Sequence, residues 1–362
     1  MKAVGLIVEF NPFHYGHKYY IKKVKELFPD YVVVCVMSGH FTERGDVSVI
    51  NKWDKTSIAL DNGIDIVIEL PFVFASSSAD LFSKGAIELL NSISVSDIVF
   101  GSECNDINKL YDIAKKQIKN DYLIKKEMSK GISYPKAVSN VNNGFDVDSP
   151  NDTLGICYIK EILLNNYNIK AHSIKRTSDF NSLELKPICS SSSIRKAIDK
   201  TIDISNYVPY DSKLINNKKL DDYFEFIKYK IISSKNLSKY MDVSEGLENR
   251  LKKYVLESSS LEDFISKVKC KRYTYNRIKR ICVHILCGLE KNYDLHNEYI
   301  RILGFNIFGQ KYLSSIKKKI NLPIVYSYKE NISSIFDMEY VSSLIYDYKL
   351  GVLEYKNKVI KK

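Results

Sequence analysis

The sequence predicts an α/β protein that begins with a parallel sheet covered by helices on both faces. Two observations predict this class: apolar runs of strand length alternate with segments of helical spacing, and the links between them are short. A third observation is that this alternation fades near residue 200, where tyrosine and lysine become dense. We therefore expect two domains, residues 1–200 and a mainly helical part at residues 201–362.

The alternation starts at the first residues of the chain. In chain order we expect a strand at Ala3–Val8, a helix at about Gly16–Leu27, a strand at Tyr31–Met37, a helix near Lys52–Asn62, a strand at Ile64–Glu69, a helix at Ala79–Asn91 and a strand at Asp97–Phe100. Turn-forming residues at Asn142–Asn151 predict a loop that leads into a helix after Asp152. In the second part helical spacing recurs at Asp221–Ser233, Leu247–Val255 and Arg277–Cys287.

Composition excludes several classes of protein. The 362 residues are 45% hydrophobic and 27% charged, which is typical of folded soluble chains and excludes a disordered or collagen-like one. No apolar run approaches the roughly 20 residues that span a bilayer, and no signal-peptide pattern opens the chain, so we expect a cytoplasmic protein without membrane contact. The seven cysteines are scattered and form no CxxC pair, which predicts reduced, mostly buried thiols.

A pair of histidines follows the first expected strand directly. The segment EFNPFHYGH, residues 9–17, carries His14 and His17 three residues apart at the start of a helix, with Gly16 allowing close backbone approach. Backbone N–H groups and the helix dipole attract phosphates there, and imidazoles can donate to developing negative charge. The alternatives are two surface polar residues, or one capping and one core histidine, but the first strand-to-helix turn is where such sheets bind nucleotides. No GxxxxGK[ST] or GxGxxG motif occurs.

A serine-rich segment provides the second signal. Residues 188–196, ICSSSSIRK, place hydroxyl groups at the start of a helix and Arg195 and Lys196 on its first turn. This pattern predicts a clamp on the β- and γ-phosphates of a nucleotide, for which we select Ser190, Ser192 and Arg195. Which serine binds phosphate stays open, and an ordinary serine N-cap with an exposed arginine is the alternative.

The histidine turn and the serine-rich segment together resemble the HIGH-type nucleotidyltransferase superfamily. Further segments support a closer resemblance: GLIVEFNPFHYGH (5–17), MSGHFTERG (37–45), IELPFVFASSSAD (68–80), FGSE (100–103), EGLENR (245–250) and KRYTYNRIKRICVHILC (271–287). Over nearly its whole length the chain is similar to the bacterial tRNA(Met) cytidine acetate ligase family. The resemblance implies a Rossmann-like parallel-sheet nucleotidyltransferase domain followed by the mainly helical one.

The resemblance also implies a reaction. The family activates acetate with ATP, forming acetyl-adenylate and pyrophosphate, and then acetylates N4 of the wobble cytidine of elongator tRNA(Met) to give N4-acetylcytidine. Acetyl-CoA is not used. We expect Mg²⁺ to accompany the ATP phosphates, no metal ligands from the protein, and no stable protein partner.

The family's site residues map onto this sequence. His14 and His17 would be catalytic, stabilising charge at the α-phosphate and the departing pyrophosphate. By the resemblance, ATP contacts would come from Ile7, Val8, Glu9, Phe10, Asn11, Pro12, Phe13, His14, Tyr15, Gly16, His17, Lys18, Tyr19, Tyr20, Gly101, Asn151 and Arg176. Gly101 as a plain turn, Asn151 as a helix cap and Arg176 as a solvated charge are the alternatives. Glu43, Arg44, Lys52 and Asp80 are expected near the site without an assigned role, although Lys52 would suit phosphate or acetate.

A basic run in the second part predicts contact with RNA. Lysines and arginines fall between residues 267 and 280 without an acidic residue, and tyrosines are interleaved. The candidate RNA contacts are Lys271, Arg272, Tyr273, Tyr275, Arg277, Lys279 and Arg280, because cations neutralise phosphates and aromatic rings stack on unpaired bases. The net charge of +11 (54 Lys+Arg against 43 Asp+Glu) agrees but is weak support, since a charge run is often only a solvated face.

Two other functions fit parts of the pattern. A small-molecule adenylyltransferase would use the same histidine and serine segments but would leave the basic second part without a role. A non-catalytic RNA-binding protein regulated by ATP would bind tRNA without releasing pyrophosphate. Acetate-dependent exchange between ATP and pyrophosphate distinguishes the three.

Overall fold

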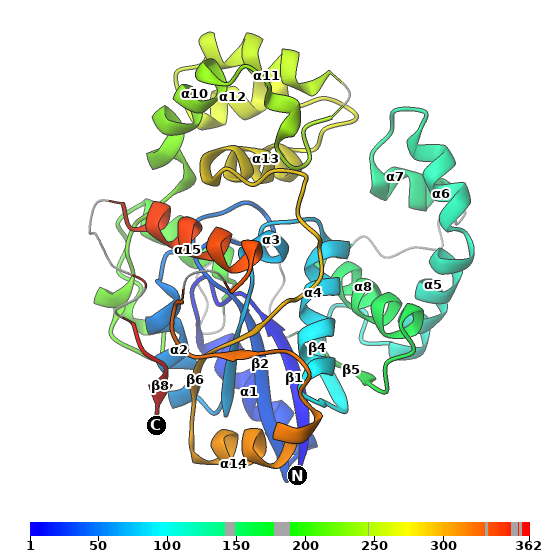
Figure 1. Cartoon of the computed structure of the whole chain (residues 1–362), viewed down its shortest axis with the longest axis vertical. Helices are drawn as coiled ribbons and strands as arrows, with labels where there is room; N and C mark the ends of the chain where they lie inside the picture. Colours follow the sequence, from blue (N-terminus) through cyan, green and yellow to red (C-terminus); the bar gives the residue numbers. More distant parts are fainter. Residues whose placement is uncertain (142–148, 177–188, 245, 330–331, 349–353, 355–356) are drawn as a thin grey trace.

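The computed structural model describes residues 1–141, 149–176, 189–244, 246–329, 332–348, 354 and 357–362. A twisted sheet forms the centre of the molecule, helices cover both of its faces, and a helical bundle stands over one end (Figure 1). Among the described residues, no helix has both the length and the apolar character needed to cross a bilayer. All seven cysteines are free thiols and five are buried, as predicted.

The sheet confirms the parallel α/β prediction. Its strands are β1 (Lys2–Val8), β2 (Tyr31–Ser38), β3 (Ile66–Leu70), β4 (Asp97–Ser102), β5 (Lys170–Lys175), β6 (Ile300–Phe305), β7 (Ile324–Val325) and β8 (Ile360–Lys361). They lie in the order β5-β4-β1-β2-β3-β6-β7, with β8 paired to β6. Strands β1 to β5 are parallel, whereas β6 runs antiparallel to β3. The order reverses between β1 and β4, and ligands bind at such switch points.

Alternate residues of the central strands feed two cores. Val33, Cys35 and Met37 of β2 pack with α1 and α2, whereas Val34 and Val36 belong to the core on the opposite face. The helices before the bundle are α1 (Tyr15–Leu27), α2 (Lys52–Asp61), α3 (Phe72–Ala75), α4 (Ala79–Ser92), α5 (Ile107–Lys119), α6 (Asp121–Met128), α7 (Tyr134–Val141), α8 (Pro150–Leu164) and α9 (Ser191–Asp199).

The predicted loop at Asn142–Asn151 falls largely outside the described residues, which resume at Ser149. Helix α8 begins at Pro150, earlier than the predicted start after Asp152. Proline suits the first helical position because its missing N–H would have no partner there.

The second part is helical at first and then returns to the sheet. Helices α10 (Phe224–Ser233), α11 (Leu247–Leu256), α12 (Leu261–Val268) and α13 (Tyr275–Cys287) form the bundle, and α14 (Ile307–Ile316) and α15 (Ser334–Tyr346) follow β6 and β7. Helix α13 lies closest to the sheet (Figure 1), and the His284 Nε2 atom is 2.9 Å from the Ser76 carbonyl oxygen. Glu245 of the EGLENR segment lies outside the described residues.

The division into residues 1–200 and 201–362 differs from this arrangement. Strand β6 is buried over all six residues and pairs with β3 of the first part on one side and with β7 and β8 of the second part. The bundle is therefore inserted between two strands of one sheet, β5 and β6, and the residues after the bundle complete that sheet. The sequence pattern did not predict β6, because a single buried strand outside a strand-helix alternation has the same apolar pattern as a buried helical segment.

Candidate active site

A cleft opens at the carboxyl ends of β1, β4 and β5, next to the point where the strand order reverses. Residues from both predicted signals line it together, although they lie far apart in the sequence. Of the predicted nucleotide contacts, those on the cleft are Ile7, Val8, Glu9, Phe10, Asn11, His14, Gly16, His17, Tyr19, Tyr20, Gly101, Asn151, Arg176, Ser190, Ser192 and Arg195.

Both histidines are held in one tautomer. The Nδ1 atom of His14 accepts the backbone N–H of Gly16 at 3.0 Å, and the Nδ1 atom of His17 accepts that of His14 at 3.3 Å. Burial and the nearby Arg176 lower the pKa of His14 to about 3, and burial lowers the pKa of His17 well below its ordinary value. Each neutral ring must therefore carry its proton on Nε2. The pair presents two N–H donors to the cleft.

A buried lysine stabilises the backbone next to the histidine turn. The buried Lys55 ammonium donates to the carbonyl oxygens of Glu9, Ser38 and Gly39, at 3.1, 2.7 and 2.7 Å. The Lys55 side chain joins the end of β1 to the end of β2, and burial lowers its pKa to about 7. Phe10 has a φ of 47°, a conformation that a bulky residue adopts only where its surroundings impose it, often at functional sites. Lys55 was not predictable from the sequence, since nothing local marks a lysine as buried.

The predicted contacts Gly101, Asn151 and Arg176 form one cluster. The Arg176 Nη1 atom donates to Asn151 Oδ1 at 3.2 Å, and the Arg176 side chain crosses Gly101, where an added Cβ would lie 3.2 Å from its Cγ. Gly101 is the penultimate residue of strand β4 rather than part of a turn after it, and Asn151 lies inside α8 rather than capping it. A larger residue at position 101 would therefore press against the Arg176 side chain.

A buried carboxylate that the sequence analysis missed supports this cluster. Asp152 accepts the backbone N–H groups of Glu103 and Cys104 at 3.2 and 3.0 Å, and Ser149 Oγ donates to it at 2.5 Å. Burial raises the pKa of Asp152, but hydrogen bonds from Ser102, Ser149 and Cys104 outweigh it, so the pKa lies below its ordinary value. Asp152 joins the end of β4 to the start of α8, which keeps Asn151 in place.

The serine-rich segment docks onto the histidine loop. Ser190 caps α9 by accepting the Ser193 N–H at 3.1 Å, and Ser191 Oγ donates to the Pro12 carbonyl at 3.2 Å. Arg195 Nη1 donates to the Asn11 carbonyl at 2.5 Å. The start of α9 and the loop after β1 therefore form two sides of the same cleft.

Four residues predicted to contact ATP do not line the cleft. Phe13 is fully buried in the core beneath it, and the Pro12 carbonyl is occupied by Ser191. Tyr15 and Lys18 are exposed on α1. They belong to the predicted contact segment, residues 7–20, but do not face the cleft, because a turn and a helix start direct only some of their side chains to one face.

The loop between β2 and α2 lines the cleft with charged residues. Glu43, Arg44 and Asp46 lie on it, as expected for this segment. Glu9 lies beside them, and its Oε1 atom accepts the Glu43 N–H at 2.8 Å. Burial raises the pKa of Glu9 to about 7 and raises that of Glu43 as well.

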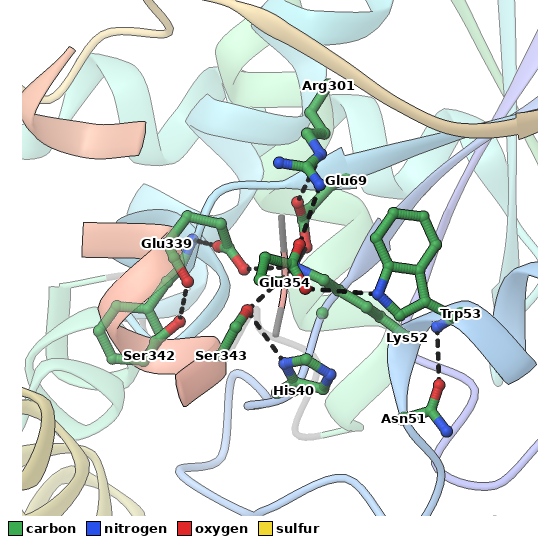
Figure 2. Close-up of polar contacts among 12 residues, drawn as sticks. His40, Asn51, Lys52, Trp53, Glu69, Arg301, Glu339, Ser342, Ser343 and Glu354 are labelled. Atoms are coloured by element: carbon green, nitrogen blue, oxygen red, sulfur yellow. Dashed lines mark hydrogen bonds and ion pairs between the residues drawn. The ribbon is translucent and has the colours of Figure 1, made fainter. Parts of the chain in front are cut away.

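Lys52 and Asp80 do not line the cleft. The Lys52 ammonium is fully buried and lies 2.6, 3.2 and 2.8 Å from carboxylate oxygens of Glu69, Glu339 and Glu354. Figure 2 shows these carboxylates around Lys52, with Arg301 completing the cluster. Asp80 pairs with Lys160 at 2.9 Å. The expectation that Lys52 neutralises phosphate is therefore wrong: three carboxylates already surround it.

The predicted RNA contacts divide into two groups. Lys271 is exposed, and Arg272 and Arg277 are half-exposed. Tyr273 is buried and donates to the Ser244 carbonyl at 3.1 Å, so its ring is not available for a base to stack on. Tyr275 donates to Glu262. Lys279 and Arg280 turn inward and pair with Asp46 and Glu43.

Among the described residues, no group of histidine, cysteine and carboxylate side chains is arranged to hold a metal ion. His40, for example, lies apart from the cleft, stacked on Tyr346 at 4.1 Å between ring centroids.

The fold and the histidine turn define a nucleotidyltransferase of the HIGH type, and the HIGH Nucleotidyl Transferase family model matches residues 1–358. The chain is 42% identical to a tRNA(Met) cytidine acetate ligase from Caldicellulosiruptor saccharolyticus over 88% of this chain and 86% of that one. It is 39% identical to the enzyme of that name from Fusobacterium nucleatum, over 99% of both chains. The chain belongs to the tRNA(Met) cytidine acetate ligase family.

Solved structures agree with this assignment. The crystal structure of Thermotoga maritima TmcAL without ligand superposes with a TM-score of 0.90 at 28% identity, covering all of both chains. The crystal structure of the same protein bound with alpha-thio ATP gives a TM-score of 0.87, again at 28% identity over all of both chains.

Proposed function

We propose that this protein is an ATP-dependent acetate ligase that acetylates N4 of the wobble cytidine of elongator tRNA(Met), giving N4-acetylcytidine. Its relatives carry the name of that activity, and a similar structure binds an ATP analogue. The observation that carries the proposal is the pair of imidazoles, His14 and His17, which line the cleft and accept backbone N–H groups at Nδ1, so that Nε2–H is left to donate to phosphate oxygens.

The chemistry follows from this arrangement. An acetate oxygen attacks the α-phosphorus of ATP, the bond to the bridging oxygen breaks, and pyrophosphate leaves with the negative charge that the imidazole donors stabilise. The cytidine amine then attacks the acetyl carbon, AMP leaves, and the amine loses a proton. Mg²⁺ travels with the ATP phosphates, and acetyl-CoA takes no part.

Further contacts extend the proposal. Gly101, Asn151 and Arg176 bind the nucleoside side of ATP, and Arg195 with Ser192 binds its phosphates. Ser192 is the best placed of the serines, because Ser190 caps the helix and Ser191 is bonded to Pro12. Lys271, Arg272 and Arg277 contact the tRNA phosphates. A tRNA substrate agrees with a location in the cytoplasm.

The test is incorporation of labelled acetate into an elongator tRNA(Met) transcript in the presence of ATP and Mg²⁺. We expect label with the wild type and none when acetyl-CoA replaces ATP and acetate. The variant Lys22→Ala, which changes an exposed lysine on α1, should incorporate label as the wild type does. Pyrophosphate exchange driven by another metabolite would favour an adenylyltransferase, and RNA binding without exchange would favour a non-catalytic protein.

A further inference from the structure

The loop between β2 and α2 is packed against helix α13. Lys279 forms an ion pair with Asp46, and the Arg280 Nη1 atom donates to the Glu43 carbonyl at 3.3 Å and to its carboxylate at 3.2 Å. The exposed fractions of the Lys279 and Arg280 side chains are only 14% and 12%. Both cations therefore face the loop rather than solvent.

The backbones touch as well. Gly45, between the two acidic residues, has a φ of +71°, and a Cβ added there would lie 2.6 Å from the backbone nitrogen of Arg280. Only a glycine fits so close an approach in this conformation. The loop therefore packs through Gly45 directly against the α13 backbone at Lys279 and Arg280.

The same loop also contacts Glu9 and Arg195, which line the cleft. The Glu43 N–H donates to Glu9 at 2.8 Å, and the Asp46 carboxylate lies 3.9 Å from Arg195 Nη2. Arg195 in turn holds the Asn11 carbonyl at 2.5 Å. Two short chains of contacts therefore connect α13 to the histidine loop and to the start of α9.

The contact between the loop and α13 brings two cations to the acidic residues of the cleft. Glu9, Glu43 and Asp46 place carboxyl groups on a cleft that is proposed to receive the phosphates of ATP. Carboxylates in the same cleft as phosphates oppose binding unless cations offset their charge. Lys279 and Arg280 supply those cations from outside the cleft.

We propose that Lys279 and Arg280 are positioning residues of the nucleotide site: they hold the Thr42–Asp46 segment in place and offset its carboxylates, so that α13 completes the ATP cleft. This inference rests on the proposed function only in that the cleft binds ATP. It assigns these two residues to the nucleotide site and leaves Lys271, Arg272 and Arg277 for RNA.

The experiment compares Lys279→Met, Lys279→Arg and Gly45→Ala with the wild type and with the control Lys252→Met, an exposed lysine on α11. ATP affinity is measured by equilibrium dialysis without RNA, and KM for ATP and kcat by acetate-dependent pyrophosphate exchange. We expect Lys279→Met and Gly45→Ala to weaken ATP binding and raise this KM by roughly tenfold or more, with kcat changed less. Lys279→Arg should restore most of the affinity, and Lys252→Met should match the wild type.

RNA affinity of the same variants separates the two possible roles. Lys279→Met should change the dissociation constant for tRNA less than twofold. Unchanged ATP affinity together with weakened RNA binding would overturn the proposal and make Lys279 an RNA contact. If the wild type shows no acetate-dependent exchange, the proposed function fails, yet the dialysis measurement still decides whether α13 completes the ATP site.

Discussion

The imidazole rings of His14 and His17 lie 3.8 Å apart between centroids, and each is fixed by a backbone N–H that it accepts at Nδ1. The helix N-terminus thus selects the tautomer in which both rings donate from Nε2. Two donors fixed before substrate arrives need little reorganisation as charge develops on the departing phosphate.

Replacing either histidine should slow the first step. We expect His14→Ala and His17→Ala each to lower kcat for acetate-dependent pyrophosphate exchange by about 10²- to 10³-fold, because each removes one donor to the developing charge. ATP affinity should change much less. His296→Ala, which removes an exposed imidazole, is the matched control. Equal losses in affinity and rate would show that the rings only bind the ground state.

Stability should depend on pH through His14. Burial lowers its pKa to about 3, whereas the unfolded chain takes up the proton near 6.5. The native state therefore binds fewer protons between these values, and the His14 contribution to the free energy of unfolding falls as pH falls through that range, by at most about 1.4 kcal/mol per pH unit.

This expectation is checked by urea unfolding of the wild type and His14→Gln at pH 7, 6 and 5. The variant has no ring to protonate, so the wild type should lose stability relative to it as the pH is lowered. A difference between the two proteins that stays constant over this range would contradict the assignment of a neutral His14.

The buried cluster around Lys52 should be important for folding rather than for catalysis. Lys52→Met leaves three buried carboxylates near one another, which should cost about 3 to 5 kcal/mol in the free energy of unfolding. Glu69→Gln should cost less, because burial and Glu339 already raise the pKa of Glu69 to about 7. Denaturant unfolding at pH 7 measures both, and equal costs would contradict the expected order.

RNA affinity should distinguish Arg277 from Tyr273. We expect Arg277→Ala to weaken tRNA binding and to reduce the slope of log affinity against log salt by about one, as for the loss of one phosphate contact. Tyr273→Phe should leave RNA affinity unchanged and cost about 0.5 to 1.5 kcal/mol of stability, because its hydrogen bond to Ser244 is lost. Filter binding at several salt concentrations measures the first effect, and weaker RNA binding by Tyr273→Phe would restore the stacking role.

Most of the early strands and helices were predictable because their signals are local. Strands β1 and β2 and helices α2 and α4 begin and end within about a residue of the predicted limits, since apolar runs and caps lie within each segment. Strand β6 was missed because a single buried strand carries no period of its own. Its place beside β3 depends on a partner more than two hundred residues away.

For this protein the sequence by itself determined the parallel α/β class, the nucleotide-binding turn and the pair of histidines, because strand, turn and helix are contiguous there and their geometry follows from local rules. The tertiary structure alone decided what the isolated charges do. Lys52 and Lys279 meet Glu339 and Asp46 across 287 and 233 residues of chain. A solvated lysine and a buried one have the same sequence signature, and only the fold determines which carboxylates surround them.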